Sequence, residues 1–183
     1  MQEMITYRAL EEGEICRALF GAFIRHQVVD LCLRRENGGW AVRPDPFVDD
    51  WSEEYYGILV DCLRNTVKTG DVVYGAFRGQ ELKGFASVES EIFGGENRYL
   101  DLTSLHVSED LRRHGIGGEL FHMAARWAAG HGASKLYISS HSAVETQGFY
   151  RGAGCVDAAQ PNPAHVESEP FDCQLEYSLQ GIG

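Results

Sequence analysis

Three glycines and three basic side chains meet in one short stretch of an otherwise acidic chain. Residues 111–120 read LRRHGIGGEL, in which two arginines and a histidine run directly into three glycines within four positions. A helical pattern of apolar residues begins at Ile116. Glycines let a ligand approach the backbone closely, and a helix N-terminus presents unpaired amides and the positive end of its dipole. The chemistry that this pattern predicts is the binding of an anion such as pyrophosphate.

Two common phosphate-binding motifs do not fit the stretch. The dinucleotide fingerprint G-x-G-x-x-G would need a glycine at Leu120, and the phosphate loop of nucleotide hydrolases would need Gly-Lys-Ser/Thr. The pattern that fits is Arg112-x-x-Gly115-x-Gly117. The alternative is a glycine-rich turn with solvated arginines and no ligand.

This stretch and its surroundings resemble the GNAT superfamily of acetyl-CoA-dependent N-acetyltransferases. Residues 112–117 match the R/Q-x-x-G-x-G/A pyrophosphate loop of that family, LTSLHVSEDLRRHGIGGELF resembles its central motif, and ETQGFYRGAGC resembles its later helix. The resemblance implies acetyl-CoA as cosubstrate and acetyl transfer to an amine. Two departures stand out, because Ala143 replaces an Asn that many members carry and Cys155 replaces an aromatic residue.

The resemblance implies mainly backbone contacts to the cosubstrate. The amide of Leu105 would face the acetyl carbonyl, that of Val107 the pantetheine arm, and the amides from Arg113 to Gly118 the pyrophosphate. The ring of His106 is expected to pack or to bond the backbone rather than act as a base. The cosubstrate site expected from the resemblance comprises Leu105, His106, Val107, Arg112, Arg113, His114, Gly115, Ile116, Gly117, Gly118 and Tyr150.

Acetyl transfer needs a neutral amine, a donor to the developing oxyanion and an acid for the departing thiolate. The resemblance implies that Tyr150 protonates the thiolate; the alternative is a packed core phenol. Asp101 lies on the strand where several members carry a catalytic Glu, and it is the candidate base because a buried carboxylate is costly unless paired or functional. An ion pair with Arg98 or Arg8 is the alternative for Asp101, and Glu89 is a rival base.

The acceptor site is expected where aromatic and acidic side chains gather. Residues 40–61 are rich in both, and after Arg151 the chain has five carboxylates but no Lys or Arg. Aromatic rings and carboxylates suit a cationic amine. A solubilising acidic surface over core aromatics is the alternative. The expected acceptor-binding residues are Trp40, Trp51, Tyr55, Glu89 and His141.

The composition of the chain restricts the classes of partner that we expect it to bind. A net charge of -11 over 183 residues disfavours nucleic acid and anionic membranes, and it favours a small cationic ligand. Five scattered cysteines without a C-x-x-C pair predict reduced, mostly buried thiols and no metal site. No signal peptide or apolar run of membrane-spanning length is evident, so we expect a cytoplasmic protein. The oligomeric state stays open, a homodimer included.

Three functions follow from these observations. The first is acetylation of a primary amine on a small, cationic molecule. The second is acetylation of a protein N-terminus or lysine, which would need an open peptide groove. The third is a non-catalytic sensor of acyl-CoA on the same fold.

One domain spanning residues 1–183 is expected to position these groups, as a GNAT-like three-layer α/β/α sandwich around a mixed, mostly antiparallel sheet. The expected order is β-α-α-β-β-β-α-β-α-β-β. Capping boxes at Asp50/Glu53 and Ser142/Glu145 would begin two of the helices. Strands are expected at residues 5–10, 71–77, 82–93, 98–107, 135–140, 155–159 and 171–179; helices are expected from Glu11, from 50 to 70, from 116 to 130 or 132, and from 142 to 151; residues 28–50 are expected to be irregular.

Overall fold

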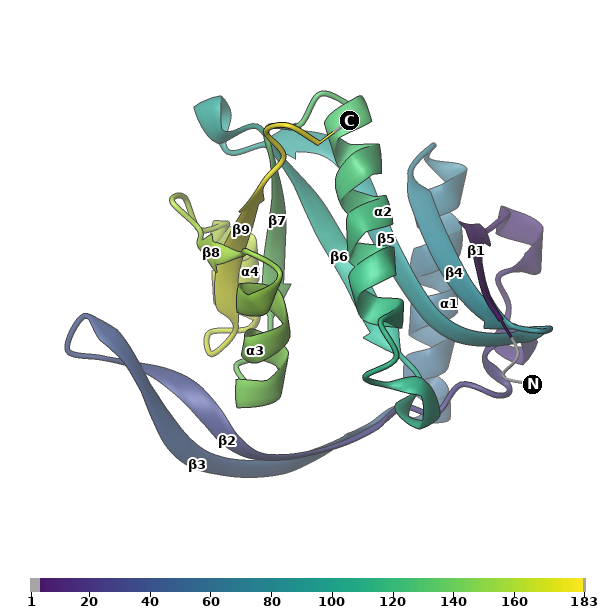
Figure 1. Cartoon of the computed structure of the whole chain (residues 1–183), viewed down its shortest axis with the longest axis horizontal. Helices are drawn as coiled ribbons and strands as arrows, with labels where there is room; N and C mark the ends of the chain where they lie inside the picture. The colour runs from purple at the N-terminus through teal and green to yellow at the C-terminus, as the bar shows by residue number, and fades with distance from the viewer. Residues whose placement is uncertain (1–3, 183) are drawn as a thin grey trace.

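A seven-stranded mixed sheet forms the body of the protein in the computed structural model, which describes residues 4–182 (Figure 1). The strand order is β1-β4-β5-β6-β7-β9-β8, and every neighbouring pair is antiparallel except β6 and β7. The predicted mixed, mostly antiparallel sheet is therefore confirmed. Its strands are β1 (Ile5–Ala9), β4 (Val72–Arg78), β5 (Glu81–Phe93), β6 (Tyr99–Val107), β7 (Lys135–Ser140), β8 (Val156–Asp157) and β9 (Cys173–Ser178).

The two parallel strands separate halfway along the sheet. β6 pairs with β7 only over Tyr99–Asp101, although β6 stays paired with β5 as far as Val107. Beyond Asp101, backbone groups on the β7 side of β6 therefore lack a ladder partner. Such groups need other hydrogen-bond partners, which a ligand can supply.

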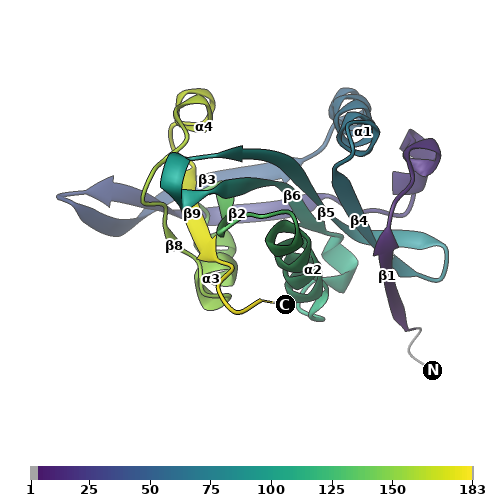
Figure 2. The ribbon, with the colours of Figure 1, turned by 90° about the horizontal axis from the view of Figure 1, so that it is seen from above.

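Four α-helices complete the three layers. Seen from above, α2 and α3 lie on one side of the sheet, and α1 and α4 lie on the other (Figure 2). Within residues 4–182, no helix is both long and apolar enough to cross a membrane. The helices are α1 (Glu53–Lys68), α2 (Ile116–Gly130), α3 (Val144–Gly152) and α4 (Pro163–Ser168).

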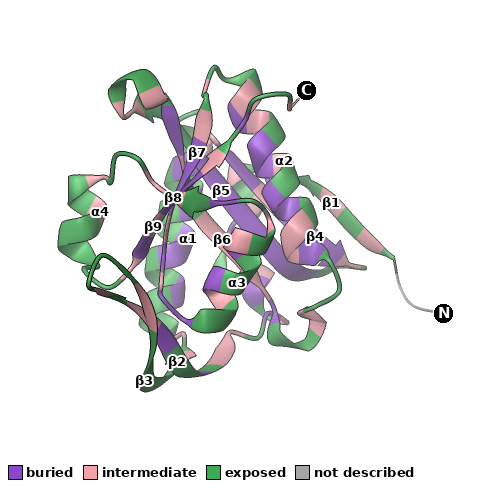
Figure 3. Cartoon of the chain, turned by 60° about the vertical axis from the view of Figure 1, so that its left-hand side comes forward, coloured by how far each residue is buried: buried purple, intermediate pink, exposed green. Residues whose placement is uncertain are grey.

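Each large helix buries one apolar face against the sheet. On α2, Ile116, Leu120 and Phe121 are fully buried at helical spacing, and they pack with residues of the central strands. Figure 3 shows buried positions along α2 and the central strands. On the opposite face, Tyr56 and Leu63 of α1 pack into a second cluster. Burying a large apolar side chain contributes roughly 1.5–3 kcal/mol, so these two faces hold the layers together.

Neither predicted capping box forms. The N-cap of α1 is Ser52, whose hydroxyl accepts a hydrogen bond from the amide of Tyr55 at 3.1 Å. The N-cap of α3 is Ala143, and no side chain caps that helix. The Ser142 hydroxyl instead accepts a hydrogen bond from Arg34. Both helices were predicted, but the residues that begin them were assigned wrongly.

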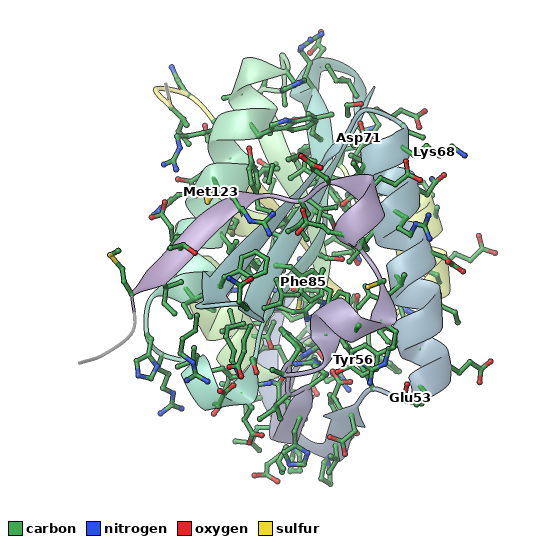
Figure 4. All side chains as sticks on the ribbon, turned by 90° about the vertical axis from the view of Figure 1, so that its right-hand side faces the viewer. Glu53, Tyr56, Lys68, Asp71, Phe85 and Met123 are labelled. Atoms are coloured by element: carbon green, nitrogen blue, oxygen red, sulfur yellow. The ribbon has the colours of Figure 1, made fainter. Side chains whose placement is uncertain are left out.

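The segment from Glu11 was wrongly predicted as an α-helix. It contains two short 3-10 helices, Glu12–Glu14 and Arg17–Phe20. Its apolar residues still reach the core, because Phe20 and Phe23 pack against Phe85 of β5 with ring centroids 5.5 and 5.6 Å apart. Figure 4 shows this side of the sheet, with Phe85 labelled beneath the N-terminal segment. Gly13 lowers helix propensity here, and packing decides the rest.

The segment predicted to be irregular is a long hairpin of β2 (His26–Glu36) and β3 (Gly39–Asp50) that extends from the body (Figure 1). Its two prolines are tolerated because β3 pairs only with β2 and has a free edge. The amide of Leu33 donates to the carbonyl of Ser142 at 2.8 Å and ties the hairpin to the start of α3.

The last helix, α4, was missed by the sequence analysis. Asn162 is its N-cap and accepts a hydrogen bond from the amide of Ala164 at 3.0 Å, and Pro163 occupies the first turn. The strand predicted at residues 155–159 is real but shorter, spanning Val156–Asp157. The expectation of mostly buried free thiols is confirmed, because Cys32, Cys155 and Cys173 are buried and all five cysteines are free.

A buried lysine holds the turn that precedes α2. Lys83 of β5 is only 3% exposed, and its Nζ donates to the Ala22 carbonyl at 2.8 Å and to Asp110 at 3.0 Å. Burial opposes ionisation of Asp110, but hydrogen bonds from Ser108 and Lys83 outweigh it and lower the pKa of that carboxyl. The pair therefore stabilises the fold through the ionised form of Asp110.

We expect Asp110→Ala to lower the free energy of unfolding by about 2 kcal/mol, because the Lys83 charge keeps only part of its partners. Urea denaturation measures the effect, with Asp61→Ala, an exposed change on α1, as the control. Since the pKa of Asp110 is depressed, the difference is fully present above the unfolded-state pKa of about 4 and shrinks below it. A difference that stays constant down to pH 3 (about a unit below that pKa) would assign the loss to packing alone.

Candidate active site

A large cavity follows the gap between β6 and β7. Its volume is about 1380 Å³, and it is lined by the separated part of β6, the start of α2, the end of β7 and α3. The end of β3, the start of α1, and α4 close the other side. The cavity therefore joins the glycine-rich turn to the aromatic and acidic segments.

The glycine-rich turn leaves amides open toward the cavity. Arg113 and Gly115 have left-handed backbones, with φ of 64° and 80°, and α2 begins directly afterwards with no side-chain cap. A Cβ on Gly118 would meet no atom within 4 Å, so the space beside this amide is open. Open amides at a helix N-terminus form an anion site, and the chain fits a pyrophosphate at this position.

An orphaned arginine atom supports the same fit. The Nη2 atom of Arg112 is buried and has no hydrogen-bond partner among residues 4–182, while its Nε donates to the Val107 carbonyl at 3.4 Å. Burial lowers the pKa of this guanidinium, and Arg25 adds to the effect. A buried, unpaired cationic donor is costly, and an anionic group would relieve that cost.

Nearly all residues predicted for the cosubstrate line this cavity. The exception is His114, which lies beside a second, smaller cavity with Met4 and Arg78, its Nδ1 2.8 Å from the Arg112 carbonyl oxygen. The lining residues are Leu105, His106, Val107, Arg112, Arg113, Gly115, Ile116, Gly117, Gly118 and Tyr150.

We expect Gly117→Val to weaken coenzyme A binding at least about tenfold, because the branched side chain would occupy the space of an anion at the amides. A Cβ there lies at ordinary contact distance, 3.4 Å from Phe149, so the fold should survive. Titration calorimetry measures the affinity. Gly148→Val, in open space on α3, is the matched control. Unchanged affinity in Gly117→Val would refute the pyrophosphate assignment.

Tyr150 reaches the cavity from α3. Burial raises the pKa of its hydroxyl, which therefore stays protonated across the neutral range. Gln147 fixes the helix by donating from its amide nitrogen to the Ser140 hydroxyl at 2.9 Å and to the His141 carbonyl at 3.0 Å. The phenol therefore lines the cavity in its protonated form.

Asp101 stands where β6 and β7 part, and its partner is His165 of α4. The Nε2 of His165 lies 2.6 Å from Oδ2 of Asp101, and their side chains are 32% and 14% exposed. The alternative ion pairs are wrong, because Arg98 donates to the Gly132 carbonyl and Arg8 pairs with Glu14. Both members of the Asp101 and His165 pair line the cavity.

Glu89 does not line the cavity. It faces Asp101 across the β5 and β6 ladder, and it is exposed. Partial burial and the nearby Asp101 raise the pKa of its carboxyl. The structure therefore brings Asp101, and not Glu89, into the cavity.

His106 and His141 line the cavity as neutral rings. Burial, with help from Arg25, lowers the pKa of His106 to about 3, and its ring packs on Trp51 at 4.8 Å. Burial and Arg25 also lower the pKa of His141. Its Nδ1 accepts a hydrogen bond from the Ala143 amide at 3.3 Å, which leaves the proton on Nε2.

Aromatic and acidic side chains also line the cavity. Trp51 and Tyr55 line it with ring centroids 5.0 Å apart. The carboxylates that line the cavity are Asp49, Asp50, Asp101, Glu145, Glu169 and Asp172. Trp40 lies elsewhere: its Nε1 donates to Asp157 at 3.0 Å, and it packs against Arg35 of the hairpin. Trp40 anchors the hairpin and is not among the cavity residues.

Two residues of the site were missed by the sequence analysis. Arg25 follows the second 3-10 helix, pairs with Asp49, and lies over the Trp51 ring at 5.3 Å. His165 reaches the site only because α4 forms, and the Asn162-Pro163 dipeptide was the signal for that helix. No local pattern marks Arg25.

Solved structures share this fold across nearly their full length. Nourseothricin acetyltransferase aligns with a TM-score of 0.70 and 17% identity, covering 96% of this chain and 98% of its own. A putative streptothricin acetyltransferase from Bacillus anthracis, in complex with acetyl coenzyme A, aligns with a TM-score of 0.68 and 16% identity, covering 94% of this chain and 96% of its own. Aminoglycoside 6'-acetyltransferase type Ii aligns with a TM-score of 0.61 and 16% identity, covering 95% of this chain and 97% of its own. At these identities the likeness shows the fold.

Sequence comparisons give the family. Comparison with curated protein sequences finds no match. The model of the acetyltransferase (GNAT) family matches residues 37–155, which include β3 of the hairpin, both parallel strands and the glycine-rich turn. The match covers more than half of the chain, and the fold agrees with it. The chain therefore belongs to the GNAT family of acetyltransferases.

Proposed function

We propose that this acetyl-CoA-dependent acetyltransferase acetylates a primary amine of a small, cationic acceptor. The observation that carries the proposal is the make-up of the cavity, which combines open amides and the unpaired Nη2 of Arg112 with aromatic rings and carboxylates. The carboxylates attract an ammonium group, and the rings offer it their faces.

The similar structures support the choice of a small acceptor. Their names give nourseothricin, streptothricin and aminoglycosides as the compounds acetylated by those proteins. In this chain, Trp51 and α4 border the acceptor end from two sides, an arrangement that suits a small molecule better than an extended peptide.

The residues can divide the reaction between them. Bound acetyl-CoA would supply an acetyl thioester, with its pyrophosphate on the amides of residues 113–118. The amide of Leu105 would donate to the acetyl oxygen as negative charge develops there. The Tyr150 hydroxyl would give its proton to the leaving sulfur. The remaining task, removal of a proton from the acceptor ammonium, belongs to the Asp101 end of the cavity.

A panel of acceptors tests the proposal through release of coenzyme A thiol. It comprises diamines, monoamines, amines that carry a carboxylate, and peptides with a free N-terminus or a lysine. We expect the highest kcat/KM for small diamines. Higher values for the peptides would favour protein acetylation, and tight acetyl-CoA binding without any turnover would favour a sensor.

The contribution of Glu169 and Asp172, two carboxylates that line the cavity, can be tested directly. We expect the double change Glu169→Gln and Asp172→Asn to raise KM for a diamine about tenfold, because two carboxylates that face the ammonium are lost. The KM for acetyl-CoA should not change. Glu167→Gln, which is exposed on α4 and outside the cavity, is the control. An unchanged KM for the diamine would mean that Glu169 and Asp172 contribute to solubility and not to acceptor binding.

A further inference from the structure

We infer that His165 is the base that takes the proton of the acceptor ammonium, and that Asp101 is the residue that positions it. The inference rests on the proposed function and assigns its proton-transfer step. It also replaces the simpler interpretation in which the Asp101 carboxylate takes the proton itself.

The hydrogen bond between the two side chains is the first argument. Oδ2 of Asp101 is engaged with Nε2 of His165 at 2.6 Å, so the carboxylate holds that ring nitrogen in its protonated form. Among residues 4–182, no hydrogen bond engages the other ring nitrogen, Nδ1. Its lone pair is therefore free to accept a proton, and the side chain is 32% exposed on the cavity wall.

The ring is held in place by its surroundings. It stacks on Tyr137 of β7, with centroids 5.8 Å apart and planes 18° apart. The Tyr137 hydroxyl in turn accepts a hydrogen bond at 2.7 Å from the amide of Asn162, the N-cap of α4. The same tyrosine thus fixes both the ring and the start of the helix that carries it. Such support is expected of a group whose position matters to a reaction.

The charges facing the ring come from several elements. They are Asp101 of β6, Asp172 before β9 and Glu89 of β5, with Glu169 close to Asp172. The hydrogen bond to Asp101, opposed in part by burial, raises the pKa of His165. The negative surroundings therefore strengthen the imidazole as a base.

Basicity favours the imidazole over the carboxylate. A primary ammonium has a pKa of about 10, an imidazole about 6.5 and an aspartate about 4. Proton transfer from the ammonium to an imidazole is thus less unfavourable than transfer to a carboxylate by at least about two pKa units. Proton transfer is also most effective when the catalytic pKa lies near the operating pH.

Acetylation of the ammonium form of the acceptor removes two protons from its nitrogen. Nδ1 of His165 takes one proton from the ammonium, directly or through one water, and the nitrogen lone pair becomes free. The amine nitrogen forms the new bond to the acetyl carbon while the carbon-sulfur bond breaks. The second proton lost by that nitrogen ends on the coenzyme A sulfur, with Tyr150 as the relay. His165 then returns its proton to solvent.

The pH profile of kcat/KM for a diamine tests the assignment. In the wild type, kcat/KM should rise with pH as His165 loses its proton, and this rise forms the acidic limb of the profile. We expect His165→Gln to lower kcat/KM about 100-fold and to remove this limb. Asp101→Asn should keep a limb and move it to lower pH, because the carboxylate that raises the pKa of His165 is replaced by a neutral amide. His122→Gln, exposed on α2, is the matched control.

Chemical rescue gives a second, independent readout. Imidazoles of different basicity, added to His165→Ala, should restore turnover, and the restored rate should increase with the pKa of the added base. Thermal melting shows whether each variant is folded. A role of His165 in structure alone would produce no such dependence.

The possible outcomes separate the two proposals. If the wild type acetylates no amine, both the proposed function and the assignment of His165 are wrong. If it acetylates amines and His165→Gln keeps the wild-type rate and limb while Asp101→Asn loses the limb, the proposed function stands and Asp101 is the base. Rescue that is independent of the pKa of the added imidazole would also overturn the assignment of His165.

Discussion

Replacing Tyr150 with Phe is expected to lower kcat about 100-fold while leaving KM for acetyl-CoA almost unchanged. The substitution keeps the ring, which packs near Phe121 and Phe149, and removes only the hydroxyl. Because burial raises the pKa of this hydroxyl, it carries its proton throughout the assay range and can give it to the leaving sulfur. A thiol with a pKa of about 8.5 leaves tolerably unaided, so part of the rate should survive.

Tyr74→Phe on β4 is the control, because Tyr74 is partly buried and lies outside the cavity. Single-turnover measurements establish that chemistry limits the rate in both variants. Equal turnover in wild type and Tyr150→Phe under that condition would make Tyr150 a packing residue, and the sulfur would take its proton from another group.

Replacing Asp101 with Asn should also lower kcat about 100-fold, with the affinity for coenzyme A nearly unchanged. The variant can still hydrogen-bond His165, but it removes the charge that holds the ring protonated at Nε2. Loss of that charge lets the ring adopt the wrong tautomer and makes it a weaker base. Steady-state kinetics with a diamine, together with calorimetry for coenzyme A, measure both quantities.

Glu89→Gln is the matched control for that change. Glu89 faces Asp101 in the β5 and β6 ladder but does not line the cavity, so its loss should change kcat less than about threefold. A normal rate in Asp101→Asn from pH 6 to 9 (about the range over which an amine acceptor can be assayed) would return Asp101 to a structural role.

The pattern of the sheet was readable because alternating and continuous apolar runs mark its strands. β5, β6 and β7 were predicted nearly to the residue, and the glycine-rich turn fixed the start of α2 at Ile116. These elements carry strong local signals: apolar periodicity, glycine turns and a motif with a physical function. Apart from Tyr150, which α3 carries, the residues predicted to bind the cosubstrate lie on β6, the glycine-rich turn and the start of α2, and all of them except His114 line the cavity.

The acceptor end was harder to read, because it is built from elements with conflicting local signals. Pro44 and Pro46 argued against a strand, yet β3 accommodates them on its free edge. Trp40 was expected to contact the acceptor, and its bond to Asp157 depends on a hairpin that the sequence did not predict. His165 was hidden because the six-residue α4 is too short for a visible periodicity.

A structure of the protein with coenzyme A and a diamine bound together is the decisive measurement. We expect diphosphate oxygens within about 3 Å of the amides of residues 113–118, and an amine nitrogen in the part of the cavity lined by Asp101, His165 and Asp172. A diphosphate bound away from that turn, or an amine outside the cavity, would contradict this expectation.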